Sequence, residues 1–338
     1  MKPKVVSTFS GTGGSCLGYK RAGCEVLLAS DFEQKAVDTY KMNFDTPIWK
    51  SNIRDMTGDK VLDFIGLERG ELDIFDGSPP CTSFSMSGKR EKGWGKDYKH
   101  ASETQSQRAD DLFFEYIRMI GELKPKMFIG ENVRGLIMGS AKEYYHRIMK
   151  DMRAQGYEVN CLDLNAKNFQ VPQSRPRVFF VGIRKDLFKG WAWPFATHPI
   201  ITVRQAVIDN PVVHTEEQLE KARRPFKVSI NAKYLIQMKQ GEQASKYHPT
   251  GSLFSYVRSH ADKPCPTITA GGFNQMFHPL EDRAFTIPEI KRICSFPDDF
   301  KFINDNDAWL RMGNSVPPNF TKNVAGHVLD SIGMEHTK

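Results

Sequence analysis

The Cys81 thiol is the side chain in this sequence best placed to act as a nucleophile. It follows the Pro79-Pro80 pair, which ends an apolar stretch predicted to be a strand over residues 73–76. Cys81 is therefore expected at the carboxyl edge of a sheet, where ligands bind in open α/β folds. An unperturbed thiol has a pKa of about 8.5, so a helix N-terminus or an arginine must favour the thiolate. No histidine lies close in sequence, which disfavours a Cys–His hydrolase.

A carboxylate and three long polar side chains lie at the ends of two further predicted strands. Glu131 follows an apolar run, where it is a candidate acid or a capping residue. Gln173, Arg175 and Arg177 lead into the apolar run at 178–183 and, in a strand, would point to one face. Such a row suits a phosphate or a base edge, and it also suits a solvated strand end.

A glycine-rich turn is predicted between the first strand and the first helix. It comprises Phe9, Ser10, Gly11, Thr12, Gly13 and Gly14. Glycines let a backbone approach a ligand closely, and a helix N-terminus adds donors. Cys16 stands where the fingerprint G-x-G-x-x-G needs its third glycine, so the pattern is F-x-G-x-G-G, a ligand loop or an ordinary strand–helix turn. Asp31 ends the second strand, where it can accept from ribose hydroxyls or cap the next helix, and Phe32 can stack on an adenine.

The six cysteines are spread along the chain without a C-x-x-C pair. A structural zinc site normally needs closely spaced Cys or His ligands, so no metal site is predicted. A disulfide framework is not expected in a long cytoplasmic chain. The thiols other than Cys81 are expected to be small buried hydrophobic groups.

The elements that position these groups alternate between strand and helix in the first half of the chain. Strands are expected at 5–9, 26–30, 73–76, 127–130 and 178–183, and helices up to about 23 and at 33–42, 111–123, 141–155, 287–294 and 319–332. This alternation predicts an α/β fold with a doubly wound, mostly parallel sheet. After about residue 184 the pattern changes to a smaller, irregular, β-rich module. The turn at 313–318 suggests that the C-terminal part packs onto a functional surface.

Composition and charge narrow the function classes. Of 338 residues, 40% are apolar and 26% charged, as in a globular protein. No apolar run approaches the roughly 18 residues of a transmembrane helix, and the N-terminus lacks a secretory signal, so a cytoplasmic protein is expected. The net charge is +7, and residues 185–265 hold twelve Lys or Arg against seven Asp or Glu. This local excess suits a phosphate-binding surface, although it also suits a solvated face.

In this order, the motifs resemble those of the cytosine-C5 DNA methyltransferase family of the prokaryotic or phage type. The resemblance spans nearly the whole chain except about 186–265, and it is carried by F-x-G-x-G-G, P-P-C, E-N-V, Q-x-R-x-R and G-N-S-V-P-P. It implies the α/β fold of S-adenosylmethionine-dependent methyltransferases. It also implies a catalytic and cofactor-binding domain at 1–185 plus 304–338 and a target-recognition domain at 186–303.

The resemblance implies S-adenosylmethionine as the cofactor, S-adenosylhomocysteine as the product and no metal. The implied cofactor-binding residues are Phe9, Gly11, Thr12, Gly13, Gly14, Asp31, Phe32, Asn52, Ile53, Pro80, Leu112, Asn314, Ser315 and Val316. Three of the residues in these motifs depart from the family pattern. Asn52 replaces an aspartate, although its amide oxygen can still accept from the adenine amino group, and Ser7-Thr8 replaces Asp-Leu.

The implied reaction begins with attack of Cys81 on C6 of a cytosine that has been flipped out of the duplex. In this reaction Glu131 bonds N3 and the exocyclic amine, and Arg175 contacts O2. Arg177 supports Glu131 or Cys81. C5 then takes the methyl group, water or another base removes the C5 proton, and Cys81 leaves.

Double-stranded DNA is the implied partner, and a monomer is expected because the whole catalytic set lies on one chain. Residues 82–100 resemble a loop that closes over the base, while 267–272 and Arg283 resemble the part that organises the recognition domain. The implied DNA-binding residues are Ser85, Ser87, Lys89, Arg90, Gln173, Arg223, Arg224 and Lys227. A cognate restriction endonuclease would be the functional counterpart in a bacterial or phage-infected cell.

Three alternatives remain open at this point. A tRNA cytosine-C5 methyltransferase would share the catalytic motifs, although the Cys-Phe-Thr element typical of that branch does not occur here. A catalytically silent DNA-binding relative would be expected to lack Cys81 or Glu131, and both are present. A thiol hydrolase would need a distant histidine near Cys81 and would leave the glycine turn without a purpose.

Overall fold

A computed structural model describes residues 1–80, 111–192 and 198–337 of the chain. The chain divides into two compact units. The first unit comprises 1–164, 176–196 and 321–338, and the second comprises 165–175 and 197–320. Residues 165–175 and 304–320 thus belong to the second compact unit. The division into a catalytic domain (1–185 and 304–338) and a target-recognition domain (186–303) is a division by function and remains a prediction.

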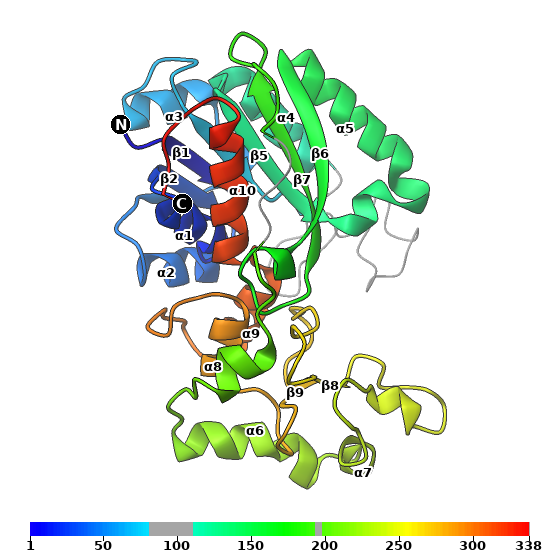
Figure 1. Ribbon diagram of the computed structural model, residues 1–338. Helices are drawn as coiled ribbons and strands as arrows, with labels where there is room; N and C mark the ends of the chain where they lie inside the picture. Colours follow the sequence, from blue (N-terminus) through cyan, green and yellow to red (C-terminus); the bar gives the residue numbers. More distant parts are fainter. Residues whose placement is uncertain (81–110, 193–197, 338) are drawn as a thin grey trace. The chain divides into compact units, whose positions relative to one another are not determined.

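The first unit is built on one sheet of seven strands (Figure 1). The strands are β1 (Lys4–Thr8), β2 (Glu25–Asp31), β3 (Ile48–Lys50), β4 (Ile74–Gly77), β5 (Met127–Val133), β6 (Tyr157–Asn165) and β7 (Pro176–Arg184). Their order is β3-β2-β1-β4-β5-β7-β6. The pairs among β1 to β5 are parallel, and β7 runs antiparallel to β5. The predicted α/β fold with a mostly parallel sheet is therefore confirmed.

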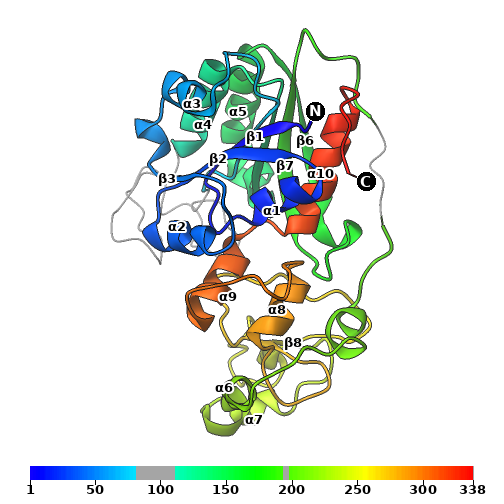
Figure 2. The ribbon, with the colours of Figure 1, turned by 90° about the vertical axis from the view of Figure 1, so that its left-hand side faces the viewer.

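Helices cover both faces of this sheet. They are α1 (Gly14–Arg21), α2 (Gln34–Lys41), α3 (Gly58–Ile65), α4 (Leu112–Leu123), α5 (Lys142–Ala154) and α10 (Pro318–Asp330), of which residues 321–330 belong to this unit. Helices α3, α4 and α5 lie on one face, and α1 and α10 lie on the other (Figure 2). Val6, Phe75 and Phe128 are paired in register across β1, β4 and β5, and they join the core beneath α3 to α5. The strands thus alternate their side chains between two helical layers.

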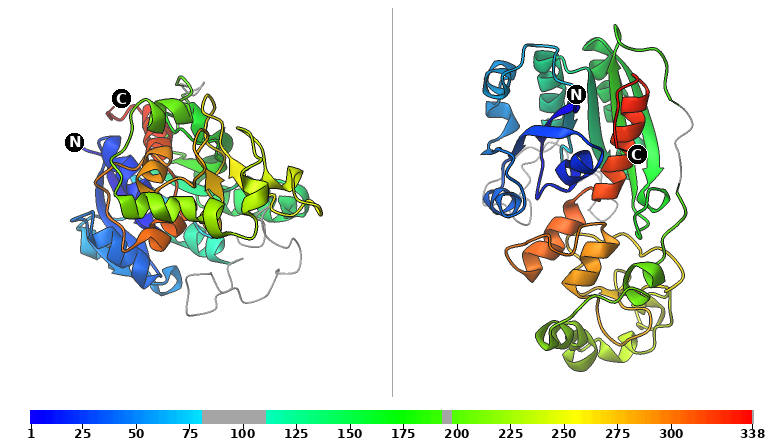
Figure 3. Two further views of the ribbon diagram at one scale, coloured as in Figure 1. Left: turned by 90° about the horizontal axis from the view of Figure 1, so that it is seen from below. Right: turned by 60° about the vertical axis from the view of Figure 1, so that its left-hand side comes forward.

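The C-terminal segment returns to the end of α1 (Figure 3). The amide of Thr337 donates to the carbonyl oxygen of Ala22 at 2.8 Å. The next residue, Gly23, has a φ of +85°, and a Cβ there would lie 2.6 Å from Thr337 Oγ1. Glycine therefore serves both the left-handed backbone and the close approach of the C-terminal segment.

The second unit is more helical than the sequence pattern predicts. Its helices are α6 (Glu216–Val228), α7 (Ala232–Leu235), α8 (Ile287–Ile293) and α9 (Asp305–Asn314), with a five-residue π-helix at Arg204–Ile208. Within its described residues, the only sheet pairs β8 (Val257–Arg258) with β9 (Met276–Phe277). The prolines and glycines of this region end most extended segments after two or three residues, because they interrupt ladder hydrogen bonding or favour turns.

A buried ion pair organises the second unit. Arg283 donates through both terminal nitrogens to the two carboxylate oxygens of Glu289, at 2.8 and 2.9 Å. Glu289 also closes the capping box of α8 with Thr286. The charge is buried here because it is paired in two-point geometry and hydrogen-bonded. No helix in the described ranges is long and apolar enough to cross a membrane.

Candidate active site

The turn after β1 has a backbone that favours glycine. Gly11 and Gly13 have φ values of +54° and +93°. A Cβ on Gly13 would lie 2.4 Å from the ring of Phe44, whereas the space beside Gly11 is open. Thr12 lies between them, and its buried hydroxyl has no hydrogen-bond partner among the described residues. The turn therefore offers a bare backbone and one unsatisfied polar group, as a ligand-binding loop would.

Asp31 holds this turn against the second strand. Its Oδ2 accepts from the amide of Gly11 at 2.8 Å, and its Oδ1 accepts from the amide of Glu33 at 2.9 Å. Asp31 thus supports the entry to α2, although the N-cap position belongs to Glu33. The adjacent Phe32 is half-buried.

The predicted residues Asn52 and Ile53 lie near the end of β2. The amide of Ser51 donates to the carbonyl oxygen of Asp31 at 3.0 Å, which brings this segment beside the acid. Asn52 Oδ1 accepts from the amide of Arg54 at 3.1 Å and so caps a short 3-10 helix. Ile53 is buried in the core, as is Leu112 at the start of α4.

The segment leading to the predicted nucleophile is fixed from the neighbouring strand. Asn132 is buried near the end of β5, and its Nδ2 donates to the carbonyl oxygen of Pro79 at 2.9 Å. Pro80 is the last described residue of this segment. Cys81 lies outside the described residues, as do the predicted DNA-binding residues Ser85, Ser87, Lys89 and Arg90.

Glu131 and Arg177 form an ion pair beside this segment. Arg177 Nε lies 2.9 Å from Glu131 Oε1, and the two side chains are only 14% and 11% exposed. Burial lowers the pKa of the Arg177 guanidinium, and the charge of Glu131 opposes that shift. Arg177 is thus a charged partner that can hold the Glu131 carboxylate in a fixed orientation.

The structure corrects the prediction that Gln173, Arg175 and Arg177 form one row on a strand. Strand β7 begins at Pro176, so only Arg177 lies within it. Gln173 and Arg175 are buried in the second unit. Arg175 donates to the carbonyl oxygens of Ile268 and Gly313 at 2.9 and 2.8 Å. Arg175 therefore ties together two segments of its own unit, because backbone carbonyls accept from its guanidinium there.

Gln173 has a similar local role. Its Oε1 accepts from the amide of Ile268 at 3.2 Å, and its Nε2 lies 3.2 Å from Cys294 Sγ. The segment at 267–272, predicted to organise the recognition domain, is thus held by both polar side chains. The substrate roles of Gln173 and Arg175 stay predictions.

Among the predicted closing residues, Asn314 is the last residue of α9, and Ser315 and Val316 follow it. Asn314 is exposed and Val316 is buried, while Ser315 Oγ donates to the carbonyl oxygen of Val316 at 3.1 Å. A Cβ on the preceding Gly313 would lie 2.4 Å from the backbone nitrogen of Ala270. Glycine is therefore needed at the end of α9 for close packing against the 267–272 segment.

The three basic residues predicted to contact DNA from α6 lie on its solvated surface. Arg223 pairs with Glu216 and Glu220, both at 3.0 Å, and Lys227 pairs with Glu220 at 3.1 Å. Arg224 is exposed. Because exposed ion pairs are weak, a phosphate can compete for these side chains.

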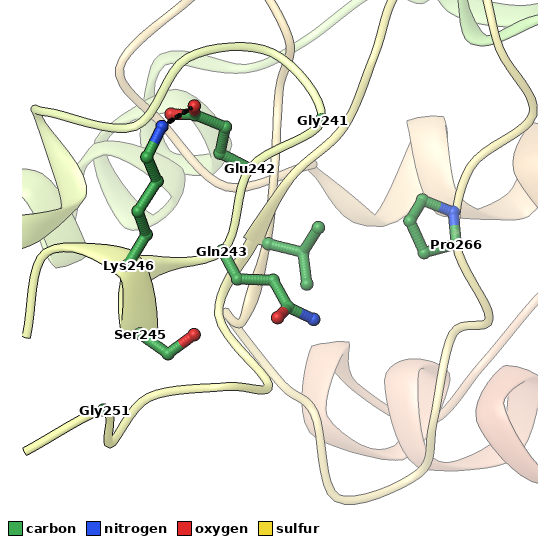
Figure 4. Close-up of a pocket in the computed structure, with 8 residues that line it drawn as sticks. Gly241, Glu242, Gln243, Ser245, Lys246, Gly251 and Pro266 are labelled. Atoms are coloured by element: carbon green, nitrogen blue, oxygen red, sulfur yellow. Dashed lines mark hydrogen bonds and ion pairs between the residues drawn. The ribbon is translucent and has the colours of Figure 1, made fainter.

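The second unit also contains a surface hollow of about 580 Å³. Its lining residues are Gly241, Glu242, Gln243, Ser245, Lys246, Gly251, Val257 and Pro266. Figure 4 shows Lys246 paired with Glu242 among the residues that line the hollow. Sequence patterns did not indicate this hollow, because its lining comes from separate turns.

A buried carboxyl of the first unit also escaped sequence analysis. Asp76 in β4 accepts from Ser7 Oγ at 2.7 Å and from the Tyr19 hydroxyl at 2.9 Å. Burial raises the pKa of Asp76 to about 7; the two hydrogen bonds lower it, and the charge of Glu131 raises it further. The one available signal was an acidic residue within an otherwise apolar strand.

Comparison with known proteins assigns the chain to one family. A model of the C-5 cytosine-specific DNA methylase family matches residues 3–330. The chain belongs to this family. The predicted enzyme class, DNA (cytosine-5-)-methyltransferase, is confirmed by this match and by the relatives below.

The curated relatives of this methylase extend over nearly its whole length. The Type II methyltransferase M.NgoFVII of Neisseria gonorrhoeae is 32% identical, over 97% of this chain and 87% of the relative. The Type II methyltransferase M.Sau96I of Staphylococcus aureus is also 32% identical, over 95% of this chain and 74% of the relative. These matches support the restriction-modification class of DNA methyltransferase.

Solved structures support the fold of the methylase. The crystal structure titled as a DNA modification methyltransferase encoded within an E. coli prophage has a TM-score of 0.76 at 20% identity, covering 97% of this chain and 99% of that one. The S. pombe Dnmt2 methyltransferase has a TM-score of 0.69 at 16% identity, covering 99% of this chain and all of that one. At these identities the likeness concerns the fold alone.

Proposed function

We propose that this methylase transfers the methyl group of S-adenosylmethionine to C5 of a flipped-out cytosine in a specific duplex DNA sequence, through a covalent bond between Cys81 and C6. The observation that supports this most is the Glu131–Arg177 pair at the ends of β5 and β7. It lies beside the Asn132–Pro79 bond that fixes the segment before Cys81. Glu131 lies near the carboxyl end of β5, and the proposed nucleophile follows the neighbouring β4 in sequence.

The residues of the first unit suit S-adenosylmethionine. Gly11 has open space beside its backbone, and the buried Thr12 hydroxyl has no partner among the described residues. Asp31 presents a carboxylate at the end of β2 for the ribose hydroxyls, and Phe32 is half-buried beside it for the adenine. When bound, S-adenosylmethionine supplies the methyl group as an electrophile on a positively charged sulfur. Asn314, Ser315 and Val316 are likewise proposed to contact the cofactor.

The protein side chains make C5 of cytosine nucleophilic. The Cys81 thiolate forms a bond to C6, and the electrons of the C5–C6 double bond become available at C5. Glu131, held by Arg177, is proposed to bond N3 and the exocyclic amine and so to offset the charge that develops on the ring. Arg175 is proposed to contact O2 of the base.

Product release restores the aromatic ring. After C5 has taken the methyl group, a base, proposed to be water, removes the C5 proton. The electrons of that bond re-form the C5–C6 double bond, and the C6–sulfur bond breaks to release the Cys81 thiolate. No metal is required, because breaking the methyl–sulfur bond would leave its electron pair on the positively charged sulfur and release a neutral thioether, S-adenosylhomocysteine.

Two sets of residues are proposed to contact DNA, the basic residues of α6 and the segment at 82–100. Arg223, Arg224 and Lys227 lie on an exposed helical face, where counterion release would favour phosphate binding. Gln173 is also proposed to contact DNA. The names of the Type II relatives support a modification role opposite a cognate restriction endonuclease. The methylase is also proposed to act as a monomer.

The test measures tritiated methyl transfer from S-adenosylmethionine onto unmethylated duplex DNA and, in parallel, onto unmodified tRNA. Label on DNA that is lost in Cys81→Ala is the expected result, and sequencing of the product gives the target site. DNA that carries 5-fluorocytosine at that site should trap a covalent complex, because fluorine replaces the proton that must leave. Label on tRNA alone would overturn the substrate, and label on neither would indicate a catalytically silent relative.

A further inference from the structure

A chain of buried polar groups runs from β4 to the glycine turn of the first unit. Asp76 Oδ2 accepts from Ser7 Oγ at 2.7 Å across the β1–β4 pair. Ser10 Oγ donates towards Ser7 Oγ at 3.1 Å and towards the Ser7 carbonyl oxygen at 2.9 Å. The amide of Ser10 donates to the carbonyl oxygen of Ser30 at 3.0 Å. Asp76 is therefore connected through two side chains to the residue that precedes Gly11.

The carboxyl of Asp76 is held as an acceptor on both oxygens. Tyr19 in α1 donates its hydroxyl to Oδ1 at 2.9 Å, while Ser7 donates to Oδ2. A protonated carboxyl has a hydroxyl donor on one oxygen, and that oxygen is a weaker acceptor, so one of these two bonds is weakened, reversed or broken. Because Ser7, Ser10, Tyr19 and Asp76 are all buried, water does not readily replace a lost partner.

The Asp76 carboxyl lies opposite a residue that departs from the family pattern. Residue 7, where the family pattern has aspartate, is Ser7 here. Asp76 is its direct partner in the register of the β1–β4 pair. The buried layer beneath the glycine turn thus retains one carboxylate, which comes from β4 in place of β1.

We propose that Asp76 is a positioning residue of the cofactor site, whose ionised carboxylate fixes the glycine turn through Ser7 and Ser10, so that protonation of Asp76 weakens cofactor binding. The inference deepens the proposed function and rests on it. Asp76 is not a catalytic residue in this proposal, since it acts through the turn.

The groups that face Asp76 decide when it ionises. Burial raises its pKa to about 7. From α1, Tyr19 and Cys16 remain neutral, because burial raises the pKa of both. Tyr116 of α4 is likewise held neutral by burial, and the charge of Glu131 from β5 favours the protonated form of Asp76. Cofactor affinity is therefore expected to rise as the pH passes upward through about 7.

The experiment measures binding of S-adenosylhomocysteine to the full-length protein by calorimetry between pH 6 and 8.5. Asp76→Asn should bind about tenfold more weakly at pH 8 and should lose the pH dependence, because it mimics the protonated carboxyl. Ser7→Ala keeps the carboxylate and removes the link to the turn, so it should also lose most of the pH dependence. Combining Ser7→Asp with Asp76→Ser should bind more tightly than Asp76→Ser alone.

Asp73→Asn is the matched control. Asp73 is a buried carboxylate just before β4, at the opposite end of the strand, where it accepts from the amide of Lys4 and from Lys126 Nζ, both at 2.7 Å. The Asp73→Asn variant should bind S-adenosylhomocysteine with the affinity and the pH dependence of the wild type. If Asp76→Asn or Ser7→Ala bound S-adenosylhomocysteine with the affinity and the pH dependence of the wild type, the inference would be overturned. No binding by the wild type would instead overturn the proposed function and, with it, this inference.

Discussion

Asn132 and Pro79 are joined by a hydrogen bond of 2.9 Å that links the ends of two neighbouring parallel strands. The Asn132 side chain is buried and also accepts from the amide of Val133 at 2.8 Å, so its orientation is fixed by two bonds. Since Pro79 lies two residues before Cys81, this amide controls how the chain leaves β4 towards the proposed nucleophile. A geometric error of about 1 Å at a reacting group is enough to cost about 100-fold in rate.

Replacing Asn132 with alanine should therefore lower kcat of DNA methylation by about 10- to 100-fold. Cofactor binding should change little, because both hydrogen bonds of the Asn132 side chain are made outside the glycine turn. Single-turnover methyl transfer, compared with calorimetric binding of S-adenosylhomocysteine, separates the two effects. Asn160→Ala is the matched control, since Asn160 makes the same local bond, to the amide of Cys161 at 2.8 Å, far along the chain from Pro79. Equal rates in the two variants would refute a positioning role for Asn132.

Glu131→Gln should lower kcat by about 100-fold or more, since the amide cannot supply the charge or proton that a general acid does. Trapping by 5-fluorocytosine DNA should slow in parallel, because bond formation at C6 depends on the same group.

Arg177→Ala should destabilise the fold by about 3 kcal/mol, as it leaves the buried Glu131 carboxylate without its partner. Combining it with Glu131→Gln should recover part of that loss in urea denaturation. A fully additive double variant would contradict the pairing.

Gly13→Ala should destabilise the protein by about 2 kcal/mol or more, because the new methyl group meets the Phe44 ring at 2.4 Å and the backbone is left-handed. Gly66→Ala serves as the control for backbone strain alone, since Gly66 has a φ of +65° with open space around it. Chemical denaturation of both variants isolates the steric part. If the two lose the same free energy of unfolding, the close approach to Phe44 is not what requires glycine.

Asp76 should make the wild type less stable as the pH rises. Its carboxyl has a pKa of about 7 in the folded state, against about 3.9 in an unfolded chain. The folded state therefore binds the proton more tightly, and the contribution to stability is full below pH 4 and declines as the pH rises to about 7. Asp76→Asn should remove this decline and melt at or above the wild-type temperature at pH 8, while binding cofactor more weakly. Melting curves from pH 5 to 8.5 that stay parallel for the two proteins would argue against this ionisation.

Arg283→Ala should destabilise the second unit by about 3–5 kcal/mol, because it leaves the buried Glu289 unpaired. Burial disfavours the ionised form of Glu289, but Arg283 outweighs it, and the pKa of Glu289 is lowered. The stability from this pair is therefore present above the ordinary glutamate pKa and is lost as the pH falls through the lowered value. Arg292→Ala removes a more exposed pair with Asp298 and should cost less than about 1 kcal/mol. Urea denaturation compares the two variants.

Local patterns predicted the elements that depend on their own residues. The alternating strands and helices of the first half, the helix at Leu112–Leu123 and the turn around Gly13 follow from apolar spacing and from glycine, whose effects are local. Strand β6 was missed because its polar and apolar residues alternate like those of an exposed segment. The β content of the second unit was overestimated, since proline- and glycine-rich stretches do not reveal which short pieces find a partner strand.

The sequence by itself determined the family, the order of the motifs and the residue types at the proposed site, because these depend only on identity and spacing. The tertiary structure decided which groups meet. It paired Glu131 with Arg177, placed Gln173 and Arg175 in the second unit before β7, and set Asp76 opposite Ser7. These outcomes depend on strand register and on where a strand begins, which are fixed by pairing between segments far apart in the chain. A pattern read along one segment contains no information about that pairing.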